Sequence, residues 1–353
     1  NSAMDGYAIR LADYAPGRTL PVQQRCYAGD MPLPLAPGCA TRLFTGSLLP
    51  EGADTVVLQE DCDESADGVV IRQAPRLGQH IRRRAEDVAG GMTLLQAGTV
   101  LRAADIALAA AQGMAALPVW PRLRVGVLTT GDELVDPGQE RAPQQIYNSN
   151  GVMLAALVQG MGACVSAVAH APDDHARLIE AFTALAADSD LVLSVGGVSV
   201  GERDLVKPAL QALGGELALW KVRMKPGKPV ALGGVGRVPV VCLPGNPVSA
   251  FAVFTVLVSP LIRRMQGRAQ TLPPVQHATL DSNRAHGDSR EEFLRVRAHA
   301  DAAGRIAVVP HAGQSSGIMS ALPWASGLAR IPAGERREPG QAVAYYDFRD
   351  WLR

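Results

Sequence analysis

The feature that most constrains this chain is a short apolar run, Asp190–Val195, that ends at two glycines. The run is rich in β-forming residues and apolar on both faces, which is typical of a central parallel strand covered by helices. Gly196, Gly197 and Gly201 then permit positive φ angles and a close approach of the backbone to an anion. Because a single glycine-rich strand end is often only a tight turn, the neighbouring segments must decide between the two interpretations.

Strands and helices alternate on both sides of this run, from Arg122 to about Gly267. This alternation predicts a doubly wound parallel sheet with helices on both of its faces. Pro260 is expected to kink or restart the last helix, because proline lacks the backbone donor that a helix interior uses. The other expected strands are Leu123–Leu128, Cys164–Val168 and Val238–Leu243, and the expected helices are Gly151–Met161, His175–Ala187, Leu205–Leu213 and Asn246–Met265.

Two segments with short strands and turns flank the α/β domain, so the fold class expected is multidomain α/β and β. Residues 1–88 alternate in short stretches between proline and glycine turns, which indicates a small barrel-like β module. Residues 89–121 contain an alanine-rich helix at Ala103–Gln112 that Gly113 ends. Residues 122–270 form the α/β domain. Residues 271–353 return to strands, clearest at Glu292–Arg297 and Arg305–Pro310, and are expected to form a second small barrel-like β domain. The strands expected in the first module are Pro21–Tyr27, Thr41–Phe44, Thr55–Gln59 and Gly68–Arg72.

The composition excludes several classes of protein. A formal net charge of zero gives no indication of a nucleic-acid partner. Five scattered cysteines without a C-x-x-C pair fit reduced thiols better than disulfides or a zinc site. No apolar run approaches the roughly 20 residues that span a bilayer, and no signal segment opens the chain. We therefore expect a cytoplasmic protein with no nucleic-acid or membrane partner.

Lysine is rare and concentrated in this sequence. Of 34 basic residues only four are lysine, and all of them fall within one short window. A composition bias toward arginine explains most of this pattern. Two of the four, Lys225 and Lys228, flank a rigid Pro-Gly turn, and a compact ammonium suits an oxyanion in a tight pocket better than a guanidinium does.

Polar loops follow three of the predicted strands, at the sheet edge where doubly wound folds bind ligands. Leu123–Leu128 leads into Thr129–Glu133, Asp190–Val195 leads into the glycines, Ser199 and Asp204, and Val238–Leu243 leads into Pro244–Pro247. Glycine loops and helix N-termini hold phosphate, and one or two carboxylates commonly hold Mg²⁺. The sequence therefore favours a phosphorylated ligand with a divalent metal.

Alternative interpretations of these loops remain. Each could be only a capped helix start or a rigid turn. The G-x-G-x-x-G and G-x-x-x-x-G-K-[ST] fingerprints are absent, which removes the usual support for a dehydrogenase or a P-loop NTPase. No G-x-S-x-G elbow is present either.

A family resemblance extends over essentially the whole chain, in order. The chain resembles the molybdopterin molybdotransferase family, which comprises the MoeA proteins and gephyrin E-domains. The segments that carry the resemblance are NSAMDGYA (1–8), FTG (44–46), PEGADTVV (50–57), IRRRAED (81–87), TTGDEL (129–134), IYNSN (146–150), GGVSVGERD (196–204), MKPGKP (224–229) and LPGNPVS (243–249).

The resemblance implies insertion of molybdate into adenylated molybdopterin with Mg²⁺, which yields molybdenum cofactor and AMP. It further implies that the α/β domain is molybdopterin-binding and MoaB/Mog-like, and that residues 89–121 belong to an elongated first domain. Molybdate is a dianion that approaches a pyrophosphate, so cations must offset the repulsion while a metal polarises the anhydride.

The resemblance assigns roles only at matching positions. Glu133 and Asp204 would hold the metal. The implied catalytic residues are Asp5, Asp87, Glu133, Asp204, Lys225 and Lys228. The implied ligand-binding residues are Thr45, Arg82, Thr130, Gly131, Gly196, Gly197, Ser199, Pro244, Gly245, Asn246 and Pro247. Two positions depart from the family, Ala85 where glycine is common and Asn148 where aspartate is frequent.

The family also implies a homodimer whose active site is shared between subunits, with molybdopterin adenylyltransferase and recipient molybdoenzymes as partners. Two rival functions stay open, and so does tungstate as the oxyanion, because the sequence does not discriminate between two anions of nearly equal size. A molybdopterin adenylyltransferase shares the TGDE and GGVS loops, but lacks the flanking β modules. A non-catalytic dimeric scaffold of the gephyrin type rests on analogy alone.

Overall fold

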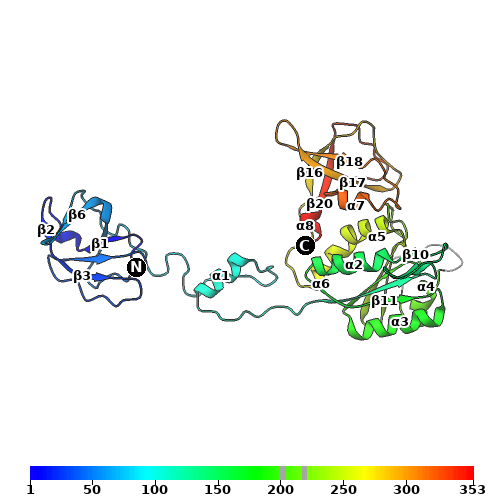
Figure 1. Cartoon of the computed structure of the whole chain (residues 1–353), viewed down its shortest axis with the longest axis horizontal. Helices are drawn as coiled ribbons and strands as arrows, with labels where there is room; N and C mark the ends of the chain where they lie inside the picture. The colour runs from blue at the N-terminus through cyan, green and yellow to red at the C-terminus, as the bar shows by residue number, and fades with distance from the viewer. Residues whose placement is uncertain (199–203, 217–220) are drawn as a thin grey trace. The chain divides into compact units, whose positions relative to one another are not determined.

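The computed structural model describes residues 1–198, 204–216 and 221–353. By internal contacts the chain divides into two compact units, an N-terminal unit, Asn1–Leu94, and a C-terminal unit, Leu95–Arg353. Figure 1 labels their helices and strands in chain order. Each unit has its own buried core, and each is described by itself below.

The N-terminal unit consists of short β-strands around two small apolar clusters. Its first sheet has the order β3-β4-β1-β5 and its second has the order β2-β7-β6. The predicted strands of this module are confirmed, whereas β1, β2 and β6 were not expected from the sequence. The strands are β1 (Gly6–Ile9), β2 (Thr19–Leu20), β3 (Val22–Cys26), β4 (Ala40–Leu43), β5 (Thr55–Leu58), β6 (Cys62–Ser65) and β7 (Gly68–Ile71), with 3-10 turns at Leu11–Asp13 and Gln59–Asp61.

The C-terminal unit begins with the predicted alanine-rich helix α1 (Ala103–Ala111). The carboxylate of Asp105 accepts a hydrogen bond from the backbone N–H of Arg102, which satisfies one of the free donors at the helix start. Gly113 has a φ of 81°, the left-handed conformation that commonly ends a helix.

The predicted doubly wound sheet is confirmed. Its order is β11-β8-β12-β15-β14, in which the first four strands run parallel and β14 lies antiparallel at one edge. β14 carries two glycines in five residues, which gave it no β signal in the sequence. The strands are β8 (Arg124–Thr130), β11 (Cys164–Ala171), β12 (Leu191–Val195), β14 (Ala231–Val235) and β15 (Val238–Leu243).

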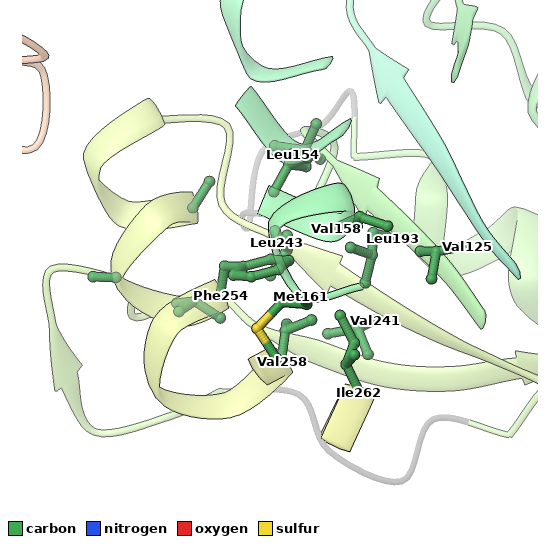
Figure 2. Close-up of a cluster of buried hydrophobic side chains, with 14 of the residues drawn as sticks. Val125, Leu154, Val158, Met161, Leu193, Val241, Leu243, Phe254, Val258 and Ile262 are labelled. Carbon is green, nitrogen blue, oxygen red and sulfur yellow. The ribbon is translucent and has the colours of Figure 1, made fainter. Parts of the chain in front are cut away.

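Helices cover both faces of this sheet, as the alternation predicts (Figure 1). One core joins α2 (Ser149–Gly160) and the segment 247–265 to the sheet, and Figure 2 shows Leu154, Met161 and Phe254 converging on Leu193 and Leu243. A second core lies under α3 (His175–Asp188) and α4 (Val206–Ala212) on the other face. Every residue of β12 is buried, as expected for a central strand.

The long helix after β15 is interrupted where the sequence suggested. α5 (Pro247–Val253) passes through a π-helical turn at Phe254–Val258 into α6 (Ser259–Met265), directly before Pro260. Proline cannot donate to the preceding turn, which accounts for the change in hydrogen bonding. By length and composition Pro247–Met265 could cross a membrane, contrary to the sequence expectation, yet 67% of its most apolar stretch is buried within the protein. This burial is typical of a core helix.

The end of the chain forms a closed β-barrel of five strands. The order is β17-β18-β16-β20-β19, and β19 pairs again with β17. A short strand, β13 (Met224–Lys225), pairs in parallel with the first two residues of β17 and so connects the α/β domain to the barrel. The barrel elements are β16 (Gln276–Leu280), β17 (Glu291–Ala300), β18 (Ile306–Pro310), β19 (Gly327–Ile331) and β20 (Ala342–Asp347), with short helices α7 (Ala321–Trp324) and α8 (Phe348–Trp351).

Candidate functional site

A cavity of about 640 Å³ lies at the carboxyl ends of β8, β12 and β15. It is the part of a doubly wound fold where ligands are expected. The loops that the sequence singled out meet there. The lining includes Thr130, Gly131, Glu133, Gly196, Gly197, Asp204, Pro244, Gly245, Asn246 and Pro247. Ser199 lies outside the described residues.

Three glycines shape the cavity through their backbones. Gly131, Gly196 and Gly197 have φ angles of 140°, 102° and 61°, which side chains rarely tolerate. A Cβ on Gly196 would lie 2.7 Å from the carbonyl and the hydroxyl oxygens of Thr130, and one on Gly197 would lie 2.7 Å from Val206. These loops therefore expose backbone where a larger residue would fill the space, as phosphate-binding loops do.

The start of α2 holds two sides of the cavity together. Asn148 caps the helix by accepting a hydrogen bond from Gly151 N–H (3.1 Å), and its Nδ2 donates to Thr129 Oγ1 (3.0 Å). Asn150 Nδ2 donates to Gly245 O (2.7 Å), so the β8 side of the cavity is tied to the β15 loop. The amide at Asn148 uses its donor and its acceptor, and aspartate would keep only the acceptor.

Sequence reasoning missed several residues of the lining. The IYNSN segment contributed to the resemblance, yet its residues were not selected as site residues. β11 ends at Ala171, three residues beyond the predicted Val168, so the sequence did not place Asp173 near a strand end. Pro229 directly follows Lys228. The missed residues are Leu134, Ile146, Tyr147, Ser149, Asn150, Asp173, Val195, Val198, Pro229 and Ser249.

The carboxylates of the cavity suit a metal ion whose remaining ligands come from a bound phosphate. Glu133, Asp173 and Asp204 all line it. In the described part of the chain, no three His, Cys, Asp or Glu side chains lie close enough to hold an ion by themselves. Thr130 Oγ1 and Asn150 Oδ1 are buried without a hydrogen-bond partner. Such an oxygen-rich set fits Mg²⁺, which normally takes one or two carboxylates and completes its shell with water and phosphate.

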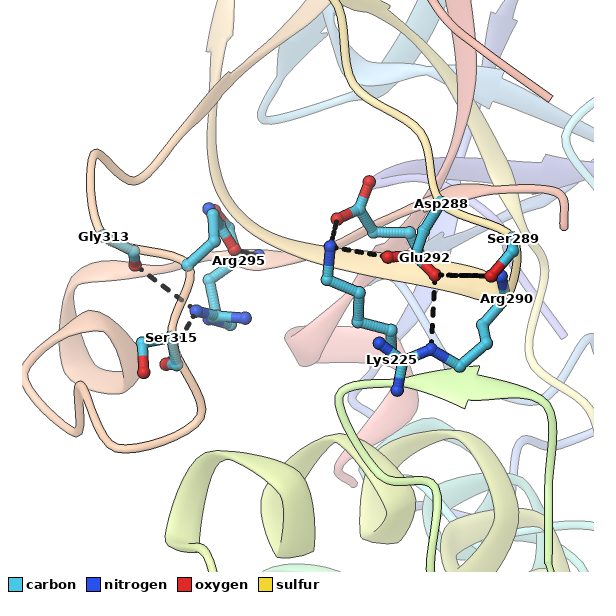
Figure 3. Close-up of polar contacts among 9 residues, drawn as sticks. Lys225, Asp288, Ser289, Arg290, Glu292, Arg295, Gly313 and Ser315 are labelled. Carbon is cyan, nitrogen blue, oxygen red and sulfur yellow. Dashed lines mark hydrogen bonds and ion pairs between the residues drawn. The ribbon is translucent and has the colours of Figure 1, made fainter. Parts of the chain in front are cut away.

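The two predicted lysines do not line the cavity. Lys225 Nζ lies 2.8 Å from Glu292 Oε1 and 2.9 Å from Asp288 Oδ2, both on the barrel side (Figure 3). Hydrogen bonds to Glu292 and Asp288 raise the pKa of Lys225, and the Lys225 ammonium holds the pKa of Asp288 well below its usual range. Lys228 is exposed on the same turn, one residue before Pro229 of the lining.

The site residues expected on the β module lie in the N-terminal unit. Asp5 Oδ1 accepts hydrogen bonds from the backbone N–H (2.7 Å) and the hydroxyl (2.8 Å) of Thr45, and these bonds lower the pKa of Asp5. The backbone of Arg82 exchanges hydrogen bonds with Asn1, and its side chain is exposed. Asp87 is exposed in a loop. Asp5 and Thr45 thus form a pair, and no hydrogen bond between these residues and Arg82 or Asp87 is found.

Three family descriptions cover the chain in order. Residues 1–113 match the MoeA N-terminal region (domain I and II), residues 126–264 match a probable molybdopterin binding domain, and residues 277–348 match the MoeA C-terminal region (domain IV). The chain is 41% identical over 345 residues to "Molybdopterin molybdenumtransferase 2" of Mycobacterium tuberculosis (strain CDC 1551 / Oshkosh), covering 94% of this chain and 84% of that protein. The chain belongs to the MoeA family.

Other MoeA-family proteins give the same result. The molybdopterin molybdenumtransferase of Haemophilus influenzae is 38% identical over 327 residues, which cover 91% of this chain and 80% of that protein. Among solved structures, a molybdopterin biosynthesis MoeA protein from Pyrococcus horikosii superposes with a TM-score of 0.83 at 30% identity, covering 99% of this chain and 88% of that chain.

Proposed function

We propose that this chain is a transferase that inserts molybdenum into molybdopterin during molybdenum cofactor biosynthesis. The observation that carries the proposal is a single cavity, in which glycine backbones, carboxylates and a prolyl loop from three parallel strands converge. Relatives named molybdopterin molybdenumtransferase match the chain over 84% and 80% of their own length. The adenylyltransferase and scaffold alternatives gain no comparable support.

We further propose that the substrates are molybdate and adenylated molybdopterin. The backbones of Gly131, Gly196 and Gly197 would bind the phosphates, because positive-φ glycines leave room for an anion against N–H groups. Pro244 and Pro247 would keep the β15 loop rigid around the ligand. Asn150, whose Oδ1 is buried and unpartnered while its Nδ2 holds Gly245, would accept a hydrogen bond from the ligand.

Mg²⁺ fits this site, and Glu133 and Asp204 would hold it together with phosphate oxygens. When bound, the ion polarises the phosphoanhydride and offsets developing negative charge. Lys228, exposed next to the lining, would attract the incoming oxyanion. Lys225 is paired with Asp288 and Glu292 outside the cavity. While these ion pairs are formed, it would hold the lysine-flanked turn in place and would not bind the oxyanion.

We propose that the functional protein is a cytoplasmic homodimer in which the N-terminal unit of one subunit completes the site of the other. Asp5, Thr45, Arg82 and Asp87 are the residues that the N-terminal unit would contribute. A molybdopterin adenylyltransferase would supply the substrate, and apo-molybdoenzymes would receive the product. No nucleic acid or membrane takes part in the proposed reaction.

The test is AMP release from adenylated molybdopterin by the purified chain with Mg²⁺, measured with and without molybdate. We expect release to rise with molybdate and the product to activate an apo-molybdoenzyme. Asp204→Asn should reduce release by at least about 100-fold, since one carboxylate of the metal site is lost. Asp188→Asn, an exposed position at the end of α3, is the matched control and should leave the rate unchanged. Unaltered release by Asp204→Asn would disprove the site assignment.

A further inference from the structure

A chain of stacked planar side chains runs from the core of the N-terminal unit to its surface. The Arg42 guanidinium lies over the Tyr7 ring (5.0 Å) and over the Phe44 ring (4.9 Å). The Phe44 ring stacks on Tyr27 with centroids 4.6 Å apart and planes inclined by 7°. We call these four residues the aromatic stack. Its inner members Tyr7 and Arg42 are buried, whereas Tyr27 at the outer end is 55% exposed.

Hydrogen bonds hold the side chains at the base of the stack and the backbone at its surface end. Arg42 donates to Gly6 O (3.1 Å) and to the side chain of Gln59, and the Tyr7 hydroxyl donates to Glu64 (2.6 Å). At the surface end, Tyr27 N–H donates to Asp30 Oδ2 (2.8 Å). An aromatic face held in place before binding loses little conformational freedom when a ring stacks on it.

The surface end of the stack adjoins the Asp5–Thr45 pair. Thr45 directly follows Phe44, and a Cβ on Gly46 would lie 3.7 Å from the Cβ of Ala28, which directly follows Tyr27. The turns 27–30 and 44–47 are therefore in contact. The turns therefore carry an exposed ring at Tyr27 and a carboxylate bound to Thr45. A fused heteroaromatic amine matches both features, because it offers a flat π surface and N–H donors along its edge.

We propose that Tyr27 is a stacking subsite for the fused heteroaromatic ring of the substrate, a pterin or an adenine. The inference rests on the proposed function, because adenylated molybdopterin contains both rings. Two side chains of the same segment, Met31 and Leu33, are also exposed. A second copy of this chain covering all three is the competing occupant, and the experiment below separates the two.

The full chain is titrated separately with neopterin and with AMP by isothermal titration calorimetry. We expect one of the two probes to bind wild type and Tyr27→Phe equally, because both variants present a ring face. Tyr27→Ala should bind that probe about fivefold to 150-fold more weakly, which corresponds to the cost of removing an aromatic side chain that stacks on one base. Met31→Ala, which removes a more exposed side chain from the same segment, should bind normally.

In the titrations and in light scattering, three outcomes would overturn the subsite: neither probe binds the wild-type chain, Tyr27→Ala binds as tightly as wild type, or Tyr27→Ala disrupts a dimer without changing ring affinity. The last outcome assigns the ring face to a second copy. The AMP-release assay keeps the two proposals apart. Normal turnover by Tyr27→Ala with an unchanged KM for adenylated molybdopterin would reject the subsite alone. Absence of turnover in wild type would reject the proposed function, and the titrations would still show whether Tyr27 binds a heteroaromatic ring.

Discussion

At the scale of single residues, Gly196 is the position where the site depends most directly on the absence of a side chain. Alanine there would have to adopt a φ near 102° and place its Cβ 2.7 Å from two oxygens of Thr130. We expect Gly196→Ala to destabilise the C-terminal unit by about 2–3 kcal/mol and to abolish AMP release, since strain and overpacking add. Gly138→Ala is the control, because Gly138 has a φ of 95° but no atom within 4 Å of its Cβ. Chemical denaturation should show only the smaller strain cost in that variant.

Ala85 is the converse case, a side chain where the backbone favours glycine. Its φ is 64°, in the left-handed region, and alanine stands here where glycine is common in the family. We expect Ala85→Gly to stabilise the N-terminal unit by about 0 to 1 kcal/mol. The free energy gained by relieving the backbone strain slightly exceeds the entropic cost of a more flexible unfolded chain. Ala89→Gly, in the same loop without a positive φ, should instead destabilise that unit by a few tenths of a kcal/mol up to about 1 kcal/mol. Equal losses in both variants would contradict the interpretation.

At the scale of elements, the contact between β13 and β17 determines where the lysine turn lies. Glu292 is buried, and its Oε1 holds Lys225. Since Lys225 is partly exposed and solvent screens its charge, we expect Glu292→Gln to cost about 1–2 kcal/mol rather than the larger value of a fully buried pair. Glu338→Gln, in the exposed pair with Arg336, should cost under about 0.5 kcal/mol. Urea denaturation followed by tryptophan fluorescence measures both, and equal costs would refute the difference between the two pairs.

The same contact predicts a dependence on pH. Asp288 accepts hydrogen bonds from Lys225 and from Arg290, and these partners hold the pKa of its carboxyl well below the usual value of about 3.9. A lowered pKa stabilises the folded state above about pH 4, and this stabilisation is lost as pH falls through the folded-state pKa. We therefore expect wild type to lose more stability than Asp288→Asn between pH 4 and pH 2. In a Lys225→Met background the difference between Asp and Asn should shrink, and an undiminished difference would show that Lys225 is not the cause.

At the scale of the whole molecule, the two units have separate cores. All four tryptophans lie beyond Leu94, so tryptophan fluorescence reports only the C-terminal unit. We expect denaturant titrations followed by fluorescence and by far-ultraviolet circular dichroism not to coincide, because circular dichroism also reports the N-terminal strands. Coincident curves with one midpoint would mean that the units unfold together. The isolated segment 95–353 should retain the fluorescence transition of the full chain.

Much of the fold follows from local sequence patterns. The strands β8, β12 and β15 and the helices between them carry their own periodicity, because burial on a sheet face or a helix stripe repeats every two or 3.6 residues. The π turn before Pro260 and the stop at Gly113 follow from the covalent structure of single residues. The three polar loops were predictable as a group, since the carboxyl ends of parallel strands meet at one sheet edge.

Other features depend on chain segments that are far apart and have no local signal. Lys225 was predicted to bind an oxyanion, and only the folded structure shows it between Asp288 and Glu292, which lie more than 60 residues later. The hydrogen bond from Asn150 to Gly245 and the closure of the barrel by β17 and β19 are of the same kind. Sequence thus determined which segments are strands, helices and anion-binding loops, because those depend on neighbouring residues. Tertiary structure decided which charges meet, because an ion pair depends on where two distant segments cross.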